Sequence, residues 1–509
     1  MMKNRRFLFQ SILCAVSGAL MTCAFAPYYI TAVAFLSFSV LFALLLVAEN
    51  KKQLFMLGCV FGFAEGAFSM FWIRNALLID GGRFIAFLPL VVLGFGLFFG
   101  VFSGISALFI RLGRTPFIKL LSFAVGWTAC ELIRGWIFTG FPWNLLGYVW
   151  GECLPVLQSV SVWGVYGLSF VSVLLFCLPV LLVYKDKKSA FLILVFWGII
   201  LLLGLLRLNE DENAMFFGIK LRLVQPNIAQ TLKWDEDSAE KNLYKHIRMS
   251  RNKAEDKITH VIWPEAATAF LLADDEPIRS LTIGALRQGQ VLLSGSLRRS
   301  DEKHLANSVV VIDDVGGFRG SYDKSHLVPF GEYVPLRGIL PLEKIVPISA
   351  DFKAGSGPKT LKIPNAPSVG MLVCYEILFS GQVVDSKKRP SWLLNVTNDA
   401  WYGMSAGPHQ HFVTARFRAV EEGLSVVRSA NNGISAVINP YGKIISRLDL
   451  GEEGVLDSEL PRPIRTTIYG RFGVFVVVFL LGGIFCGVLV HFFRKNSGGY
   501  FIREKEKVT

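Results

Sequence analysis

Cys374 is a candidate nucleophile. It directly follows the apolar run 369–373 and is the only one of the chain's eight cysteines within the polar stretch from about 209 to 470. With no second cysteine in that stretch, it has no local partner for a disulfide. An inert core cysteine remains the alternative, because free cysteines are among the most buried residue types.

Glu265 and Lys324 supply the groups that a thiol nucleophile needs. Glu265 ends the segment Trp-Pro-Glu, and Lys324 ends Tyr-Asp-Lys. A thiol with a pKa near 8.5 is only a few per cent ionised at neutral pH, so it requires a base and a nearby cation. We expect Glu265 to take the proton and Lys324 to lower the thiol pKa and donate to the oxyanion of a tetrahedral intermediate.

The pattern from residue 217 onward predicts the domain that positions these residues. Short β-type runs alternate with amphipathic helical patterns, which is typical of an α/β domain whose sheets are covered by helices. The predicted strands are 221–224, 260–263, 291–294, 308–312, 369–373, 393–397, 425–428 and 436–439. The predicted helices are 238–254, 277–288 and 408–422.

The remainder of the chain is strongly apolar and predicts an integral membrane protein. Hydrophobic residues make up 52% of the sequence, too high a fraction for an ordinary soluble enzyme. Eight stretches are long enough to span a bilayer: 7–26, 28–48, 54–73, 84–110, 117–139, 154–183, 189–207 and 472–493. We therefore expect a bundle of seven transmembrane helices at 1–208, an α/β catalytic domain at 209–470, an eighth transmembrane helix at 471–494 and a tail at 495–509.

The distribution of basic residues predicts the orientation of this arrangement. Nearly all of the surplus positive charge, +13 for the whole chain, falls at the termini or in alternate short loops. By the positive-inside rule, both termini are cytoplasmic and the α/β domain is extracytoplasmic. Within that domain acidic and basic residues nearly balance, which removes the usual reason to infer nucleic-acid binding. The first span also resembles a signal peptide with Ala24-Phe25-Ala26 at a possible cleavage position, but its cleavage would leave the other spans in place.

Two further segments invite an interpretation. Glu131 and Arg134 lie three residues apart in a predicted span and could pair, because an unpaired charge there is costly. Residues 334–342 carry four apolar side chains that suit either a lid at headgroup depth or burial against the domain: Leu336, Ile339, Leu340 and Leu342.

The order of the motifs resembles a known superfamily. Trp-Pro-Glu265, then Tyr-Asp-Lys324 with Gly-Glu332-Tyr downstream, then Val-Cys374-Tyr-Glu is similar to the nitrilase, or carbon–nitrogen hydrolase, superfamily. That resemblance implies an αββα sandwich in which Glu265 is the base, Lys324 the electrostatic stabiliser and Cys374 the nucleophile.

With seven spans before the domain and one after it, the chain resembles the bacterial apolipoprotein N-acyltransferase family from end to end. Further matching segments are Gln225-Pro-Asn-Ile228 with Lys233-Trp234, Asn307-Ser308, and Asn398 to Gly403. The resemblance implies supporting positions at Glu332, Tyr375 and Glu376. Trp234 and Trp401 are plausible substrate contacts, with packing at a domain edge as the alternative.

The resemblance also implies a two-step reaction. Cys374 would take an acyl chain from a membrane phospholipid as a thioester, and the α-amino group of a diacylated apolipoprotein's N-terminal cysteine would then accept it. The enzyme would lie in the bacterial inner membrane with a periplasmic catalytic domain, act as a monomer and need no cofactor. His409 and His411 lack the spacing of zinc ligands and are interpreted as polar surface or site-edge residues.

Two other functions use parts of the same pattern. A membrane-tethered amidase of the nitrilase type would pass the acyl group to water, although seven spans exceed what a tether needs. A transporter with an appended domain would show two repeated halves, and no repeat is visible in the sequence.

Overall fold

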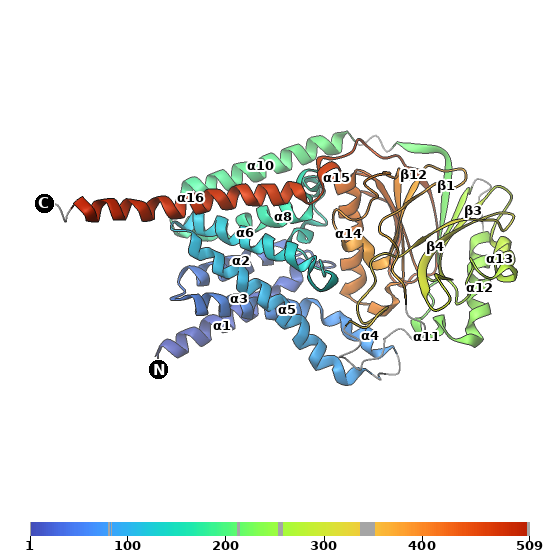
Figure 1. The fold of residues 1–509 in the computed structure, drawn as a ribbon, viewed down its shortest axis with the longest axis horizontal. Coiled ribbons are helices and arrows are strands. Elements are labelled where there is room, and N and C mark those ends of the chain that lie inside the picture. The colour runs from blue at the N-terminus through green and yellow to red at the C-terminus, as the bar shows by residue number, and fades with distance from the viewer. Residues whose placement is uncertain are drawn as a thin grey trace. The chain divides into compact units, whose positions relative to one another are not determined.

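The chain divides into two compact units, each containing segments that are distant in sequence. The computed structural model describes residues 2–79, 82, 84–210, 214–252, 258–335 and 352–505. One unit consists of Met1–Phe71, Pro89–Leu206 and Arg471–Thr509, and the other of Trp72–Leu88 and Arg207–Gly470 (Figure 1). The segment 72–88, which includes the end of the span predicted at 54–73 and the start of the one predicted at 84–110, thus belongs to the same unit as the polar region.

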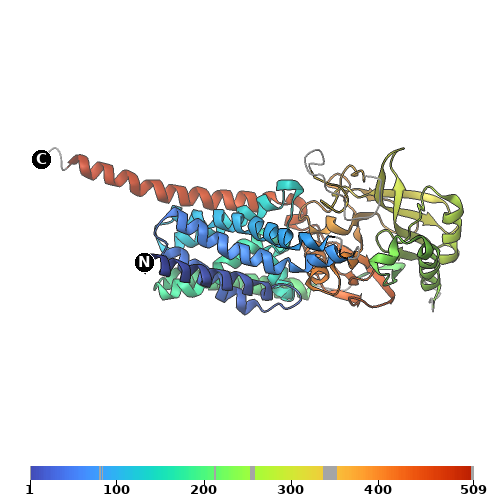
Figure 2. The same cartoon turned by 90° about the horizontal axis from the view of Figure 1, so that it is seen from below.

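The first unit is a bundle of apolar helices (Figure 2). Each apolar stretch of the sequence contains at least one helix. The long helices are α1 (Met2–Met21), α2 (Thr31–Leu46), α3 (Lys51–Ser69), α5 (Leu88–Leu108), α6 (Pro116–Arg134), α8 (Val160–Phe176), α10 (Lys187–Asn209) and α16 (Phe475–Lys505). The short helix α9 (Leu178–Val183) follows α8.

Six helical segments among the described residues are long and apolar enough to cross a membrane. A seventh would be the bent pair Lys51–Ser69 and Phe71–Leu78, whose axes differ by 41°. Helix α2 has 16 residues and is about 24 Å long, shorter than a hydrocarbon core of about 30 Å. The protein is therefore a membrane protein, and the eight crossings expected from the sequence stay a prediction.

Small residues allow the helices of this bundle to approach one another closely. A Cβ added at Gly18 of α1 would lie 2.1 Å from the backbone oxygen of Phe61 on α3. A Cβ at Gly58 of α3 would lie 2.5 Å from the backbone oxygen of Ser103 on α5. Small residues at helix contacts are typical of packing within a membrane, where apolar burial alone does not drive helices together.

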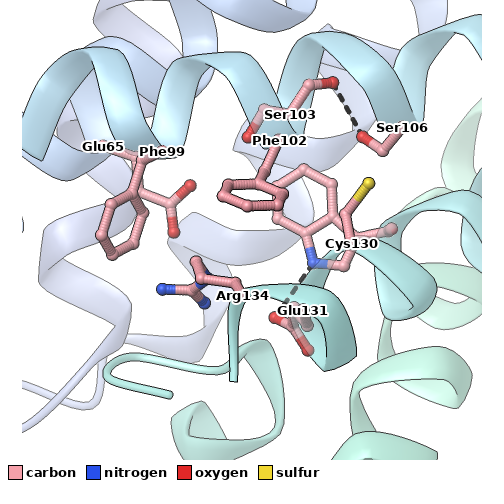
Figure 3. A pocket seen from close by; sticks show the side chains of 9 residues that line it. Glu65, Phe99, Phe102, Ser103, Ser106, Cys130, Glu131 and Arg134 are labelled. Atoms are coloured by element: carbon pink, nitrogen blue, oxygen red, sulfur yellow. Dashed lines mark hydrogen bonds between the residues drawn. The ribbon is translucent and has the colours of Figure 1, made fainter. Parts of the chain in front are cut away.

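Buried charges in α3 and α6 line a small cavity of about 20 Å³, roughly the space of one water molecule (Figure 3). Glu131 accepts a hydrogen bond from the backbone N–H of Leu146 at 2.8 Å, and Arg134 donates to the carbonyl of Trp143 at 2.8 Å. Glu65 lines the same cavity. Backbone groups after α6 thus provide partners for the two charges that the sequence analysis expected to pair.

The second unit is built on two six-stranded sheets. The first has the order β12-β1-β2-β3-β4-β5 and the second β11-β10-β9-β8-β7-β6. The strands of the first sheet are β1 (Met215–Gln225), β2 (His260–Trp263), β3 (Val291–Arg299), β4 (Leu305–Asp313), β5 (Phe318–Asp323) and β12 (Gly454–Pro461). Those of the second are β6 (Thr360–Leu361), β7 (Val369–Val373), β8 (Trp392–Thr397), β9 (Ser425–Ala430), β10 (Ser435–Ile438) and β11 (Ile444–Leu448).

Helices cover the outer faces of both sheets (Figure 1). Helices α12 (Glu236–Arg251) and α13 (Glu276–Thr282) pack on the first sheet, and α14 (Ala406–Glu422) packs on the second. Side chains of both sheets, such as Ile262 and Met371, fill the core between them. The predicted αββα sandwich and the eight predicted strands are confirmed. Each predicted helix contains a helix, but the one expected at 277–288 ends at Thr282 with a 3₁₀ turn to Ala285, and the one expected at 238–254 ends at Arg251.

The parallel strands place candidate site residues at one edge of each sheet. β1, β2 and β3 are parallel neighbours in the first sheet, and β7, β8 and β9 in the second. Glu265 lies just beyond the carboxyl end of β2, Cys374 beyond β7 and Asp399 beyond β8. Loops at the carboxyl ends of parallel strands are a common location for ligand sites.

Candidate active site

Cys374 occupies a strained turn at the end of β7. Its φ is +50°, a left-handed conformation that a non-glycine residue adopts only when its surroundings impose it. The turn begins the 3₁₀ helix η8 (Cys374–Leu378), and the side chain is buried. The preceding N–H, of Val373, donates to Glu376 Oε2 at 2.7 Å, which fixes the entry to the turn.

Glu376 connects this turn to the loop that carries Lys324. Its Oε1 accepts hydrogen bonds from Tyr322 Oη at 2.7 Å and from Ser325, through the backbone N–H at 2.8 Å and Oγ at 2.7 Å. Burial raises the pKa of Glu376, and these donors together with Val373 only partly offset that rise. The side chain of Glu376 thus connects the turn at Cys374 to the loop that carries Lys324 and fixes their relative positions.

Lys324 is held between two carboxylates. It follows β5, its backbone N–H donates to the carbonyl of Asn307 at 2.8 Å, and its side chain is only 1% exposed. Nζ lies 2.9 Å from Glu332 Oε2 and 3.8 Å from Glu265 Oε1. Burial disfavours the ammonium, but the two carboxylates outweigh it and raise the pKa of Lys324. Lys324 is therefore a permanent cation.

Glu265 is held by both its side chain and its main chain. Asn307 Nδ2 donates to Glu265 Oε1 at 2.8 Å and to Glu332 Oε1 at 3.0 Å. Lys233 Nζ donates to the main-chain carbonyl of Glu265 at 2.7 Å. Burial is the main reason that the pKa of Lys233 falls to about 8. One asparagine thus orients both carboxylates around Lys324.

The thiol of Cys374 is protonated in the resting site. Burial raises its pKa, and Glu265 raises it further, whereas Lys324 lowers it without compensating. Lys324 thus lowers the thiol pKa as expected, but burial outweighs this contribution. Two carboxylates raise the pKa of this thiol, Glu265 with the larger effect and Asp399 with the smaller one.

Three other predicted residues lie at the edges of this arrangement. The ring of Tyr375 packs edge-on against Phe379, with centroids 5.2 Å apart. Trp234 follows α11 (Gln230–Lys233), and its indole N–H is buried without a hydrogen-bond partner in the described part of the chain. Trp401 lies in the 3₁₀ helix η9 (Asp399–Tyr402) and is partly exposed. Substrate contact by the two tryptophans stays a prediction.

One of the two alternatives given for His411 is wrong. The residue is completely buried and so is not a surface residue, whereas its Nε2 lies 3.2 Å from the carbonyl oxygen of Cys374, which agrees with the site-edge alternative. Helix α14 is polar in sequence yet buried on nearly all sides, so its composition concealed its location. The predicted lid at 334–342 falls almost entirely outside the described residues.

Comparison with known proteins agrees with this architecture. Residues 17–178 match the description "Apolipoprotein N-acyltransferase N-terminal domain", and residues 220–469 match "Carbon-nitrogen hydrolase". An apolipoprotein N-acyltransferase of Rhodopseudomonas palustris is 34% identical over 96% of this chain and 96% of its own length. The chain belongs to the apolipoprotein N-acyltransferase family.

Other members of the family align over a similar extent. The protein of Brucella melitensis is 37% identical over 90% of this chain and 90% of its own length. That of Rickettsia prowazekii is 33% identical over 94% and 97%. The chain is therefore an acyltransferase that joins membrane-type helices to a nitrilase-like domain.

Proposed function

We propose that the protein performs the N-acylation step of bacterial lipoprotein maturation. It moves an acyl chain from a membrane phospholipid to the α-amino group of the S-diacylglyceryl cysteine of an apolipoprotein. The observation that carries this proposal is the convergence of Glu265 and Lys324 on the buried Cys374, in a chain whose apolar helices suit lipid substrates.

In the first half-reaction Glu265 removes the thiol proton as Sγ attacks the ester carbonyl carbon of the phospholipid. The ammonium of Lys324 stabilises the oxyanion, a role that one well-placed donor fulfils strongly. The intermediate then collapses, the ester C–O bond breaks, and Glu265 returns the proton to the departing glycerol oxygen. A lysophospholipid leaves, and the acyl chain remains on Cys374 as a thioester.

In the second half-reaction the apolipoprotein amine attacks the thioester carbonyl. Glu265 accepts a proton from the amine nitrogen, and Lys324 again stabilises the oxyanion. The C–S bond breaks, an amide forms, and the thiolate recovers the proton from Glu265. Glu332 and Asn307 keep the ammonium and the base in place through both steps.

Water competes with the amine for the thioester. A site that opens among lipids and closes behind apolar loops excludes water, and residues 334–342 are our candidate for such a loop. Trp234 and Trp401 are candidate contacts for the acyl chain or the lipopeptide, and Tyr375 is a candidate support for the turn.

The proposal includes a location. The chain lies in the bacterial inner membrane as a monomer, with both termini cytoplasmic and residues 209–470 periplasmic between a seven-helix bundle at 1–208 and an eighth helix at 471–494. The tail at 495–509 is cytoplasmic. Basic residues concentrated at the termini and in alternate loops support this orientation.

The amidase alternative uses the same three residues but passes the acyl group to water. Purified protein is incubated with phospholipid carrying a labelled acyl chain, with or without a diacylated lipopeptide. We expect the label in an amide on the lipopeptide, and no product with the Cys374→Ala variant. Labelled free fatty acid as the main product in the presence of lipopeptide would contradict the transferase assignment.

A further inference from the structure

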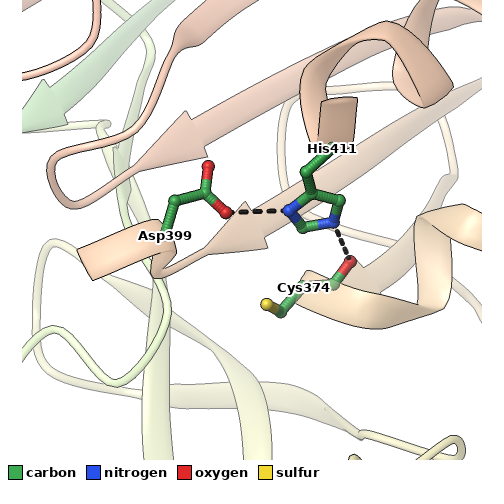
Figure 4. A group of neighbouring side chains, drawn as sticks. All are labelled: Cys374, Asp399 and His411. Atoms are coloured by element: carbon green, nitrogen blue, oxygen red, sulfur yellow. Dashed lines mark hydrogen bonds and ion pairs between the residues drawn. The ribbon is translucent and has the colours of Figure 1, made fainter. Parts of the chain in front are cut away.

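We propose that His411 is a positioning residue for the nucleophile, acting through a hydrogen bond from its ring to the main-chain carbonyl of Cys374. The inference rests on the proposed role of Cys374 and extends it to a second buried network. Figure 4 shows His411 lying between Asp399 and the carbonyl oxygen of Cys374.

The geometry fixes the ring from both sides. Nε2 lies 3.2 Å from the oxygen of Cys374, and Nδ1 lies 2.8 Å from Asp399 Oδ1. Arg428 Nη2 donates to Asp399 Oδ2 at 2.8 Å and lies 3.1 Å from His411 Nδ1. His411, Asp399 and Arg428 all have fully buried side chains, so the arrangement is not loosened by exchange with solvent.

A second residue supports the same carbonyl. Asn395 on β8 directs its Nδ2 toward the oxygen of Cys374 at 3.5 Å, and its Oδ1 accepts from Arg428 Nη1 at 2.5 Å. The carbonyl of the strained residue is therefore approached by two donors from different elements, α14 and β8. Arg428, on β9, connects those donors.

The residue types Cys374, His411 and Asp399 could also form a protease-like triad, but the contacts favour another role. A carbonyl oxygen only accepts hydrogen bonds, so Nε2 carries a hydrogen and presents no lone pair toward the thiol. Nδ1 faces a carboxylate oxygen of Asp399 and needs a hydrogen for the same reason, so with both contacts made the ring has no lone pair with which to act as a base. His411 therefore acts on the position of the nucleophile and leaves proton transfer to Glu265.

The same three residues are the one group in the described part of the chain whose ligand atoms, all within 4.8 Å of one another, could hold a metal ion. Asp399 and His411 already engage protein groups with the atoms they would need for a metal. The guanidinium of Arg428 beside that carboxylate repels a cation. The hydrogen-bonding role explains the cluster better.

Positioning matters here because the turn is strained. With φ at +50°, Cys374 keeps its direction only while its neighbours hold the peptide groups on both sides. Glu376 holds the N–H of Val373, the residue before Cys374. His411 and Asn395 hold the carbonyl of Cys374 itself. Releasing the carbonyl lets Sγ shift, and a displacement of about 1 Å can cost about 10²-fold in rate.

Two substitutions of His411 separate positioning from mere packing. The amide nitrogen of glutamine reaches about the place of Nε2, whereas that of asparagine reaches only the place of Nδ1. We expect His411→Gln to retain thioester formation within about tenfold of the wild type and His411→Asn to lose about 10²-fold. The measurement is the single-turnover acylation rate with labelled phospholipid, with the Km for phospholipid unchanged in both variants.

Controls keep the outcomes distinct. His409→Gln, on the same helix, is expected to acylate at the wild-type rate. Equal rates for the glutamine and asparagine variants, or the reverse order, would overturn the positioning role. Cys374→Ala is assayed in parallel. Acylation in that variant would refute the proposed function itself. If Cys374→Ala is not acylated but His411→Asn is acylated at the wild-type rate, only the positioning role of His411 is refuted.

Discussion

At the scale of single residues, the site combines a protonated thiol with a cation that never loses its charge. Lys324 touches both Glu265 and Glu332, and its raised pKa keeps it an ammonium throughout the working pH range. In the proposed mechanism its contribution is electrostatic, directed at charge that develops on the substrate carbonyl. In the same proposal the proton moves through Glu265.

Replacing Lys324 tests whether it has the electrostatic role and Glu265 the proton-transfer role. We expect Lys324→Ala to lower kcat/Km by at least about 10²-fold, because one oxyanion donor is worth roughly 10² to 10³ in rate. The assay is acyl transfer from phospholipid to lipopeptide. Lys359→Ala removes an exposed lysine that donates to the Ser321 carbonyl and is expected to leave the rate unchanged. A Lys324→Ala enzyme with most of its activity would remove the oxyanion role.

The protonated thiol predicts a particular pH dependence. Because the pKa of Cys374 is raised, the thiolate is a minor species at neutral pH, and its population grows about tenfold for each pH unit. Alkylation of Cys374 by iodoacetamide, followed on its own peptide by mass spectrometry, should therefore accelerate continuously from pH 7 to pH 9. A rate that is already constant below pH 7 would show a preformed thiolate instead.

The local sequence predicted Glu265 and Cys374 as site residues, but it did not predict the buried network of His411, Asp399 and Arg428. Glu265 and Cys374 directly follow apolar runs, so sheet topology alone places them at strand ends. Asp399 follows a predicted strand and Arg428 ends one, but their contact with His411 could not be predicted, because it depends on α14 packing against the second sheet. Burial of a polar helix is a tertiary property that composition does not reveal.

At the scale of elements, the second unit uses close backbone contacts to fix its catalytic loops. A Cβ at Gly295 of β3 would lie 2.3 Å from the carbonyl oxygen of Pro264 and 2.5 Å from Cα of Glu265. No side chain fits there without moving the base. Glycine at position 295 therefore allows the main chain of Glu265 to lie this close to β3.

Gly295→Ala is the matching experiment. We expect about 10²-fold slower acylation, since the substitution displaces Glu265, and a loss of about 1–3 kcal/mol in unfolding free energy from overpacking. Acylation is measured per folded molecule, with thermal unfolding alongside. At Gly284 a Cβ would only reach ordinary contact, 3.4 Å from Ile247 Cγ2, so Gly284→Ala should match the wild type. Full activity in Gly295→Ala would show that the base tolerates displacement.

The strands that the sequence failed to predict share one property. β5, β6, β11 and β12 are the four edge strands of the two sheets. Central strands are buried on both faces and read as continuous apolar runs, whereas β11 and β12 are mostly half-buried and carry polar residues. An edge strand is identified by its pairing with a neighbouring strand, and the local pattern of apolar residues carries no information about that pairing.

At the scale of the whole molecule, the number of membrane crossings decides which compartment holds each terminus. An even number places both termini on one side, and an odd number separates them. Two segments can each change that parity: the bent pair Lys51–Ser69 with Phe71–Leu78, and helix α2 with its 16 residues. The charge distribution favours an even number with both termini cytoplasmic.

Reporter fusions test this orientation directly. Alkaline phosphatase, which is active only after export, should be active when fused after Asn209 and inactive when fused after Thr509. Green fluorescent protein, which fluoresces when it folds in the cytoplasm, should show the opposite pattern. Active phosphatase after Thr509 would place the C-terminus outside the cytoplasm, and inactive phosphatase after Asn209 would place the α/β domain inside it; either result would contradict the orientation.

The central claim is that Cys374 carries the acyl chain between two lipid substrates. The most direct measurement is mass spectrometry of the Cys374 peptide after incubation with phospholipid, before and after addition of a diacylated lipopeptide. The account predicts the mass of one acyl group on Cys374, which disappears as the amide product forms. Product formation with no acyl group on Cys374, or with the acyl group on another residue, would contradict it.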